Sequence, residues 1–120
     1  MPEIRVLLVE DEPILRELMI FALDEIGANV TAVDSAQGAA EILANQAWSL
    51  LITDVQTPGP IDGWDLAWKA FNTWPELPIV VTSGYTSRTQ DLLPPAAVFI
   101  SKPWGLDQFL NVVGERISHS

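Results

Sequence analysis

The sequence predicts an α/β fold in which five parallel strands form one sheet with helices on both faces. Short runs of Val, Ile and Leu alternate along the chain with segments of helical period, and polar or breaker residues bound each run. Strands separated by helical crossovers pair in parallel through right-handed connections. Near-continuous apolar strands are typical of a sheet covered on both faces. The predicted strands are Ile4–Glu10, Asn29–Val33, Leu50–Thr53, Ile79–Thr82 and Ala97–Ile100.

The first helix is predicted to begin at Glu12-Pro13 and to end at Gly27. Proline is favoured at the first helical position, acidic side chains suit the positive end of the helix dipole, and glycine is a common stop. Apolar residues at the spacing of one helical face predict the side that packs on the sheet. That face comprises Leu15, Leu18, Met19, Ala22, Leu23 and Ile26.

The second and third helices have weaker but recognisable signals. Ser35 is a good N-cap for a helix whose inner face carries Ala36, Ala39, Ala40 and Leu43. The third helix is predicted over Gly63–Thr73, and Pro75 and Pro78 bracket its exit. Its buried stripe is predicted to contain Trp64, Ala67, Trp68 and Phe71.

The last two helical segments differ in how clearly the sequence predicts a helix. Residues 85–96 are polar, lack apolar periodicity and close on Pro94-Pro95, so the fourth helix is predicted to be irregular and no longer than about two turns. The final helix has a clear apolar face. This face comprises Leu106, Phe109, Leu110, Val113 and Ile117.

Bulk composition narrows the possible classes of protein. With 120 residues, 48% hydrophobic and 18% charged, the chain fits one globular domain. No apolar run approaches the roughly 20 residues that span a bilayer, and Arg5 interrupts the N-terminal run too early for a signal peptide. Cysteine is absent, which fits a cytoplasmic protein. A net charge of −10 with six scattered basic residues argues against direct binding of nucleic acid.

Polar side chains follow four of the predicted strands where each strand ends. They are Glu10, Asp11, Asp54, Ser83 and Lys102. If the first and third strands are neighbours, three carboxylates converge there, and an oxygen-only ligand set favours a hard cation such as Mg²⁺. A lysine and a hydroxyl nearby suit an anion carried on Asp54. The alternative for Asp54 is a carboxylate that caps its own loop.

Four motifs in order give the chain a resemblance to a known family. Val-Glu-Asp-Glu-Pro closes the first strand, Asp54 through Gly63 matches an Asp-x-x-x-Pro-Gly-x-Asp-Gly loop, and Ser83-Gly84 and Lys102-Pro103 follow later strands. Together they resemble the receiver domain of two-component response regulators, over essentially all 120 residues. The resemblance implies a flavodoxin-like doubly wound (βα)₅ sheet with strand order 2-1-3-4-5.

The resemblance also implies roles for individual residues. Asp54 would be the phospho-acceptor, and Lys102 the amine that pairs with the phosphoryl group. Glu10, Asp11 and Asp54 would bind Mg²⁺ together with the backbone carbonyl of Gln56. Ser83 would be the switch hydroxyl, with Thr82 as a rival.

Four further features match the family at places that are less central to the chemistry. Phe99 resembles the aromatic switch, and Gln56 and Tyr85 resemble the positions that tune phosphoryl lifetime. The Lys102-Pro103 bond would be cis. The sequence departs from the pattern in two places: the loop after Asp54 is one residue longer, with Pro60 as the insertion, and the short fourth helix puts the common dimerisation surface in doubt.

The expected function is therefore that of a free-standing, single-domain switch rather than a metabolic enzyme. A sensor histidine kinase or histidine phosphotransfer protein would supply the phosphoryl group, and an unknown downstream protein would read the change. The domain would be a monomer or a weak homodimer. Alternatives are a degenerate receiver acting as a scaffold, a Mg²⁺-dependent phosphohydrolase, and a flavodoxin-like cofactor carrier. Gln56 counts against the phosphohydrolase, which needs a carboxylate there, and Glu10-Asp11-Glu12 would repel the carrier's phosphate.

Overall fold

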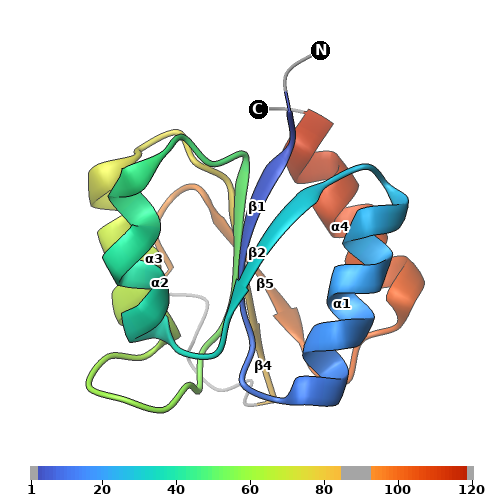
Figure 1. Ribbon diagram of the computed structural model, residues 1–120, viewed down its shortest axis with the longest axis horizontal. Helices are drawn as coiled ribbons and strands as arrows, with labels where there is room; N and C mark the ends of the chain where they lie inside the picture. The colour runs from blue at the N-terminus through green and yellow to red at the C-terminus, as the bar shows by residue number, and fades with distance from the viewer. Residues whose placement is uncertain (1–2, 85–92, 119–120) are drawn as a thin grey trace.

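A computed structural model describes residues 3–84 and 93–118, which form a five-stranded parallel sheet between two helical layers (Figure 1). The strands run in the order β2-β1-β3-β4-β5, as the resemblance to receiver domains implies. Each is within two residues of its predicted bounds. They are β1 (Arg5–Val9), β2 (Asn29–Val33), β3 (Leu50–Asp54), β4 (Ile79–Ser83) and β5 (Ala97–Ser101).

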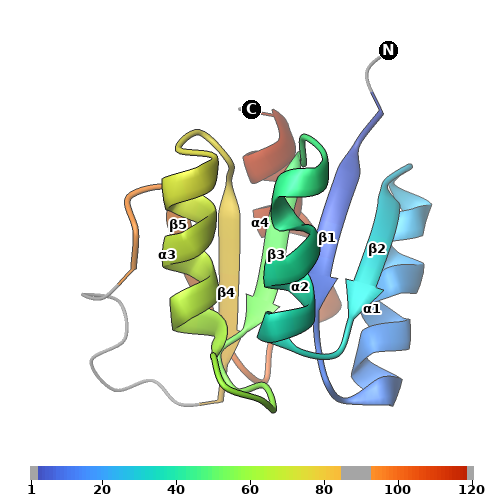
Figure 2. The same cartoon turned by 60° about the vertical axis from the view of Figure 1, so that its left-hand side comes forward.

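Helices cover both faces of the sheet. They are α1 (Pro13–Glu25), α2 (Ala36–Ile42) with the short 3₁₀ helix η1 (Leu43–Asn45), α3 (Gly63–Thr73) and α4 (Leu106–Ser118). Figures 1 and 2 show α1 and α4 on one face and α2 and α3 on the other. The predicted irregular fourth helix lies mostly outside the described residues. Of that segment, residues 93–96 are described, and they form turns and irregular backbone.

Side chains alternate between the two faces along each strand and build two separate cores. Under α2 and α3 the core includes Leu7, Val9, Leu51, Val81, Leu66 and Ala70. Under α1 and α4 it includes Val6, Leu8, Ile52, Val80, Met19 and Phe109. This alternation fixes the face to which every polar residue at a strand end belongs.

Local signals position the helices much as the sequence predicts. Pro13 is the first residue of α1, and Gly27 adopts a φ of +84° just beyond its end, where an L side chain would be strained. The Oγ of Ser35 accepts a hydrogen bond of 3.0 Å from the backbone N–H of Gly38, which caps α2. Caps of this kind depend on neighbouring residues alone, so the sequence can reveal them.

The predicted buried faces of α3 and α1 are partly wrong. Trp68 is 41% exposed, and the fully buried side of α3 comprises Gly63, Leu66, Ala67 and Ala70. On α1, Leu18 and Ile26 are 45% and 41% exposed, whereas Met19, Ala22 and Leu23 are buried. Both helices carry more apolar residues than one face can hold, so periodicity alone did not locate the centre of the contact.

The arrowheads of Figure 2 point to one edge of the sheet, and the described chain begins before β1 and ends after α4 at the other. Polar residues at the strand ends therefore gather at a single edge, hereafter the carboxyl edge. Within residues 3–84 and 93–118, no helix combines the length and apolar character needed to cross a membrane.

Candidate functional site

Glu10 directly follows β1, and hydrogen bonds hold both its backbone and its side chain. Its N–H donates to the carbonyl of Val33 at 3.1 Å, and its own carbonyl accepts from Nη1 of Arg16 at 2.8 Å. One carboxylate oxygen, Oε2, accepts from the N–H of Glu12 at 3.2 Å. The residue is fully buried, which is unusual for a carboxylate and requires partners.

Asp54 is the last residue of β3, and only 6% of it is exposed. Its Oδ1 accepts from the N–H of Gln56 at 3.3 Å. Behind it, the N–H of Gly63 donates to the carbonyl of Val55 at 2.8 Å. A Cβ on Gly63 would lie 2.2 Å from the carbonyl oxygen of Asp54, so only glycine allows α3 to begin this close to the strand end.

Lys102 follows β5 and joins the two buried carboxylates. Its Nζ lies 3.1 Å from Oδ2 of Asp54 and 3.3 Å from Oε1 of Glu10. The backbone N–H of Lys102 donates to the carbonyl of Ser83 at 2.8 Å, and the bond to Pro103 is cis, as predicted. One ammonium thus bridges residues from the ends of β1 and β3.

The predicted carboxylate cluster is present. Oxygens of Glu10, Asp11 and Asp54 all lie within 4.8 Å of one another, with Asp11 exposed at the mouth of the cluster. Three carboxylates against one ammonium leave a charge of −2 when all are ionised. An all-oxygen, open-mouthed site of that charge suits Mg²⁺, which keeps several waters. The part assigned to the backbone carbonyl of Gln56 stays a prediction.

Burial and the neighbouring charges shift the pKa values of Glu10 and Lys102. Burial raises the pKa of Glu10, as does the nearby charge of Asp54, against the hydrogen bond from Glu12 and the charge of Lys102. Burial acts to lower the pKa of Lys102, but the hydrogen bond and charge of Asp54, followed by Glu10, raise it overall. The lysine is therefore held as a cation beside the carboxylate expected to react.

The remaining predicted residues lie at different distances from this cluster. Ser83 ends β4 and is buried, on the face of the sheet opposite to that of Thr82. Phe99 is half-buried on β5 and packs against the core under α2 and α3. Gln56 is exposed, and Tyr85 lies outside the described residues.

Two contacts at the site were missed from the sequence. One is the bond from Arg16 to the Glu10 carbonyl, and the other is the pairing of Lys102 with Glu10 as well as Asp54. Residues 10 and 102 stand 92 positions apart, so only the strand order brings them together. No pattern in the sequence signalled either contact.

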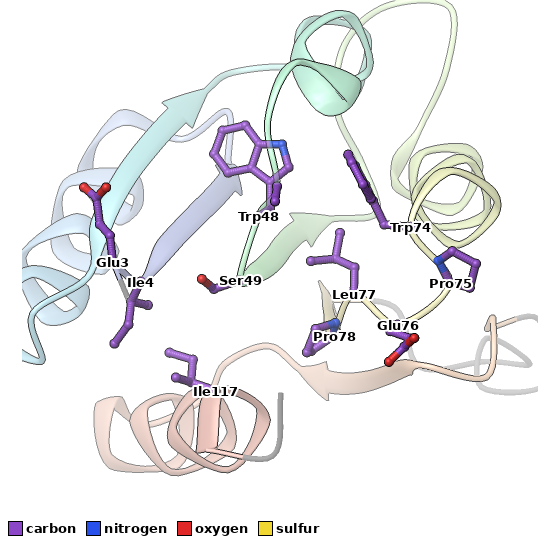
Figure 3. A pocket seen from close by; sticks show the side chains of 11 residues that line it. Glu3, Ile4, Trp48, Ser49, Trp74, Pro75, Glu76, Leu77, Pro78 and Ile117 are labelled. Carbon is purple, nitrogen blue, oxygen red and sulfur yellow. The ribbon is translucent and has the colours of Figure 1, made fainter. Parts of the chain in front are cut away.

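A pocket of about 570 Å³ at the opposite edge of the sheet is not part of this site (Figure 3). Trp48 and Trp74 line it, and both indole N–H groups donate to the carbonyl of Leu43 at 3.0 Å. No carboxylate of the cluster and no lysine line it. We therefore place the chemistry at the carboxyl edge.

Comparison with known proteins decides which family the site belongs to. The family model described as the response regulator receiver domain matches residues 6–114. This chain belongs to that family. The receiver protein CpdR of Brucella abortus is 33% identical over 116 residues, which cover 94% of this chain and 96% of CpdR. FleR, a response regulator protein of Pseudomonas aeruginosa, is 36% identical over 115 residues, and this chain spans only 24% of its length.

Solved structures of receivers have the same fold. A response regulator receiver protein from Sinorhizobium medicae gives a TM-score of 0.90 at 30% identity, covering 97% of this chain and 95% of that one. TrrA of Thermotoga maritima, solved in complex with Mg²⁺ and BeF, gives 0.84 at 26% identity, covering 94% and 98%. This receiver is thus a signalling switch domain of two-component systems rather than a classical enzyme.

Proposed function

We propose that this receiver accepts a phosphoryl group on Asp54 from a sensor histidine kinase or a histidine phosphotransfer protein, and that the modified form signals to a downstream protein. The observation that carries the proposal is the environment of Asp54. It is a nearly buried carboxylate at the end of β3, with a lysine ammonium 3.1 Å from one oxygen and two further carboxylates beside it.

The transfer step needs little from the protein beyond position and charge. A carboxylate oxygen of Asp54 forms a P–O bond as the P–N bond of the donor phosphohistidine breaks, and the electron pair of that bond returns to the imidazole. Lys102 neutralises negative charge on a phosphoryl oxygen. Because Oδ1 already accepts from the N–H of Gln56, the carboxylate is oriented before the donor arrives.

Glu10, Asp11 and Asp54 would hold Mg²⁺, with the backbone carbonyl of Gln56 as a further ligand. The fit rests on the all-oxygen donor set and on the charge of −2 that Lys102 leaves uncompensated. When bound, Mg²⁺ supplies positive charge to the transferring phosphoryl oxygens. The exposed position of Asp11 leaves one side of the cluster open to a partner protein.

The signal follows from the new charge. A phosphoryl group adds a charge of roughly −1.5 to −2 beside Lys102 and the hydroxyl of Ser83. We assign Ser83 the role of donor to a phosphoryl oxygen, because it is the last residue of β4, one position beyond Thr82, which pairs with Asp54 in the sheet. Phe99, half-buried on β5, is the aromatic side chain that would change position with it. The two states then differ in the surface near β4 and β5.

Hydrolysis ends the signal. Water attacks phosphorus, the P–O bond to Asp54 breaks, and the products are inorganic phosphate and the original carboxylate. Gln56, exposed beside Asp54, and Tyr85 would tune the approach of that water. The only catalysis would thus be on the receiver's own phosphoryl group. The free-standing arrangement, cytoplasmic location and weak self-association expected from the sequence stay predictions.

The test is the intact mass of the protein after incubation with acetyl phosphate, with Mg²⁺ or with a chelator. We expect a Mg²⁺-dependent gain of one phosphoryl group that maps to Asp54 and is absent from Asp54→Asn. Asp107→Asn, which removes an acidic residue from the first turn of α4, is the matched control and should label like the wild type. Mg²⁺-dependent labelling of Asp54→Asn would refute the assignment.

A further inference from the structure

Thr82 has a hydroxyl that nothing in the described part of the chain satisfies. The residue is fully buried in β4, and its Oγ1 has no hydrogen-bond partner among residues 3–84 and 93–118. Buried polar atoms are nearly always paired, because leaving one unpaired costs free energy that an apolar side chain would avoid. Valine has almost the same shape and would fill the same space. Among the described residues, the hydroxyl of Thr82 therefore has unused capacity to accept a hydrogen bond.

The sheet register places Thr82 beside the phosphorylation site. Thr82 pairs with Asp54 of β3 on one side and with Ile100 of β5 on the other. Neighbouring strands lie about 4.8 Å apart. By alternation Thr82 shares a face with Val80, and Asp54 shares a face with Ile52, and both of these lie in the core under α1 and α4. The two side chains are thus direct neighbours on one face.

The route of Lys102 crosses the same position. Lys102 begins at the end of β5, yet its Nζ reaches Asp54 on β3 and Glu10 at the end of β1. In the order β1-β3-β4-β5, the strand between β5 and β3 is β4. The lysine side chain must therefore pass over the carboxyl end of β4. On the face of Asp54, the last side chain of β4 is that of Thr82.

In this structure the ammonium of Lys102 is held by two carboxylate oxygens. Those carboxylates are also the ones that would hold Mg²⁺, and Asp54 would carry the phosphoryl group. Once their oxygens are occupied, one N–H of the ammonium pairs with a phosphoryl oxygen, and its other two donors need acceptors close to the path of the side chain. The Oγ1 of Thr82 has unused acceptor capacity there and no charge that would compete with the phosphoryl group.

We propose that Thr82 is a positioning residue, whose hydroxyl accepts a hydrogen bond from the Lys102 ammonium when the carboxylates of Glu10 and Asp54 are occupied. The inference rests on the proposed function and adds a second hydroxyl to it. Ser83 acts on the phosphoryl group, and Thr82 acts on the lysine that pairs with that group. The unpaired hydroxyl of Thr82 thereby lowers the stability of the free receiver, and it holds Lys102 in the correct place in the phosphorylated receiver.

Two variants and two measurements test this. Thr82→Val removes the hydroxyl and keeps the shape, whereas Thr82→Ser keeps the hydroxyl. The first measurement is the midpoint of thermal unfolding with a chelator present. The second is the affinity for beryllofluoride, a phosphoryl mimic, at saturating Mg²⁺, followed by tryptophan fluorescence. For Thr82→Val we expect a higher unfolding midpoint than the wild type and an affinity about five- to tenfold weaker. For Thr82→Ser we expect an affinity within twofold of the wild type.

The outcomes separate the inference from the function on which it rests. If Thr82→Val binds beryllofluoride as tightly as the wild type, the hydroxyl does not position Lys102 and the inference is overturned. A lower unfolding midpoint for Thr82→Val also overturns it, because the hydroxyl would then already be paired in the free receiver. If the wild type itself binds no beryllofluoride, the proposed function fails and the inference fails with it.

Discussion

The two edges of this sheet are built from the same five strands but differ in how they hold their polar groups. We call the edge at which the strands begin the amino edge, opposite the carboxyl edge. At the amino edge, Trp48 and Trp74 both place their indole N–H groups on the Leu43 carbonyl, and the Ser49 hydroxyl accepts from the Arg5 N–H at 3.0 Å. At the carboxyl edge, Glu10 and Asp54 are buried as two carboxylates that share one lysine. The amino edge pairs these polar groups with one another, and the carboxyl edge keeps negative charge in excess.

The difference shows how a stable fold can carry a reactive site. Two carboxylates about 4 Å apart repel by roughly 4 kcal/mol at an effective dielectric constant near 20, and burial adds to that cost. The Lys102 ammonium, which pairs with both buried carboxylates, and the two buried cores beneath the cluster offset this cost. Substitutions at the carboxyl edge should therefore change ligand binding, whereas those at the amino edge should change stability alone.

Among these substitutions, Gly63→Ala should cause the largest change in the free energy of unfolding. The new Cβ would lie 2.2 Å from the carbonyl oxygen of Asp54 and 2.7 Å from Cα of Val55, and backbone atoms cannot move aside cheaply. We expect a loss of about 3 kcal/mol in the free energy of unfolding, measured in urea, and impaired labelling of Asp54.

Gly114→Ala is the matched control, because nothing lies within 4 Å of the Cβ it would add in α4. Replacing a glycine inside a helix should stabilise the receiver by about 1 kcal/mol. Equal effects of the two substitutions would mean that the close approach at Gly63 does not constrain the site.

Binding of Mg²⁺ should cause the next largest change in the free energy of unfolding. At about one hundred times its dissociation constant, a ligand of the folded state adds about 2.7 kcal/mol to the free energy of unfolding. Asp11→Asn should remove most of this gain, and since Asp11 is exposed, stability in chelator should change by no more than about 0.5 kcal/mol.

Glu25→Gln, at the far end of α1, removes one exposed charge without touching the cluster. Thermal unfolding with and without Mg²⁺ compares the three proteins. A full Mg²⁺ response in Asp11→Asn would remove that residue from the site.

Trp74→Phe probes the amino edge with a smaller expected effect. The substitution keeps an aromatic ring but removes one of the two hydrogen bonds to the Leu43 carbonyl, at a cost of about 1 kcal/mol. The stabilisation by Mg²⁺ should be unchanged, and the effects of Trp74→Phe and Asp11→Asn should add in the double variant. Non-additivity would show that the two edges are coupled.

The pH dependence should give the smallest effect, because Lys102 and Glu12 partly offset the burial of Glu10. The pKa of Glu10 is raised from its ordinary value of 4.5, so the folded receiver binds its proton more tightly than the unfolded chain does. In chelator, stability should therefore fall as the pH rises above 4.5 and level off beyond the raised pKa. Glu10→Gln should lack this part of the fall, measured by urea unfolding across the pH range. Parallel curves for the two proteins would contradict the assignment.

Most of the fold was predictable because its signals are local. Strand bounds came from short apolar runs, and helix ends from Pro13, Gly27 and Ser35, each of which acts through its own backbone neighbours. The gathering of Glu10, Asp54 and Lys102 was also predictable, since parallel strands end at the same edge. Trp68 was placed wrongly, because α3 has apolar residues on more than one side.

The sequence by itself determined the alternation of strands and helices, the edge at which the charged residues meet, and the resemblance to receivers. Only the tertiary structure decided which atoms touch. The strand order brings Lys102 to Glu10 as well as Asp54, and the register places Thr82, rather than Ser83, on the face of Asp54. The physical reason is that a strand turns successive side chains to opposite faces, and neighbouring strands come from distant parts of the chain. Which polar group lies beneath the lysine therefore depends on pairing that no local pattern encodes.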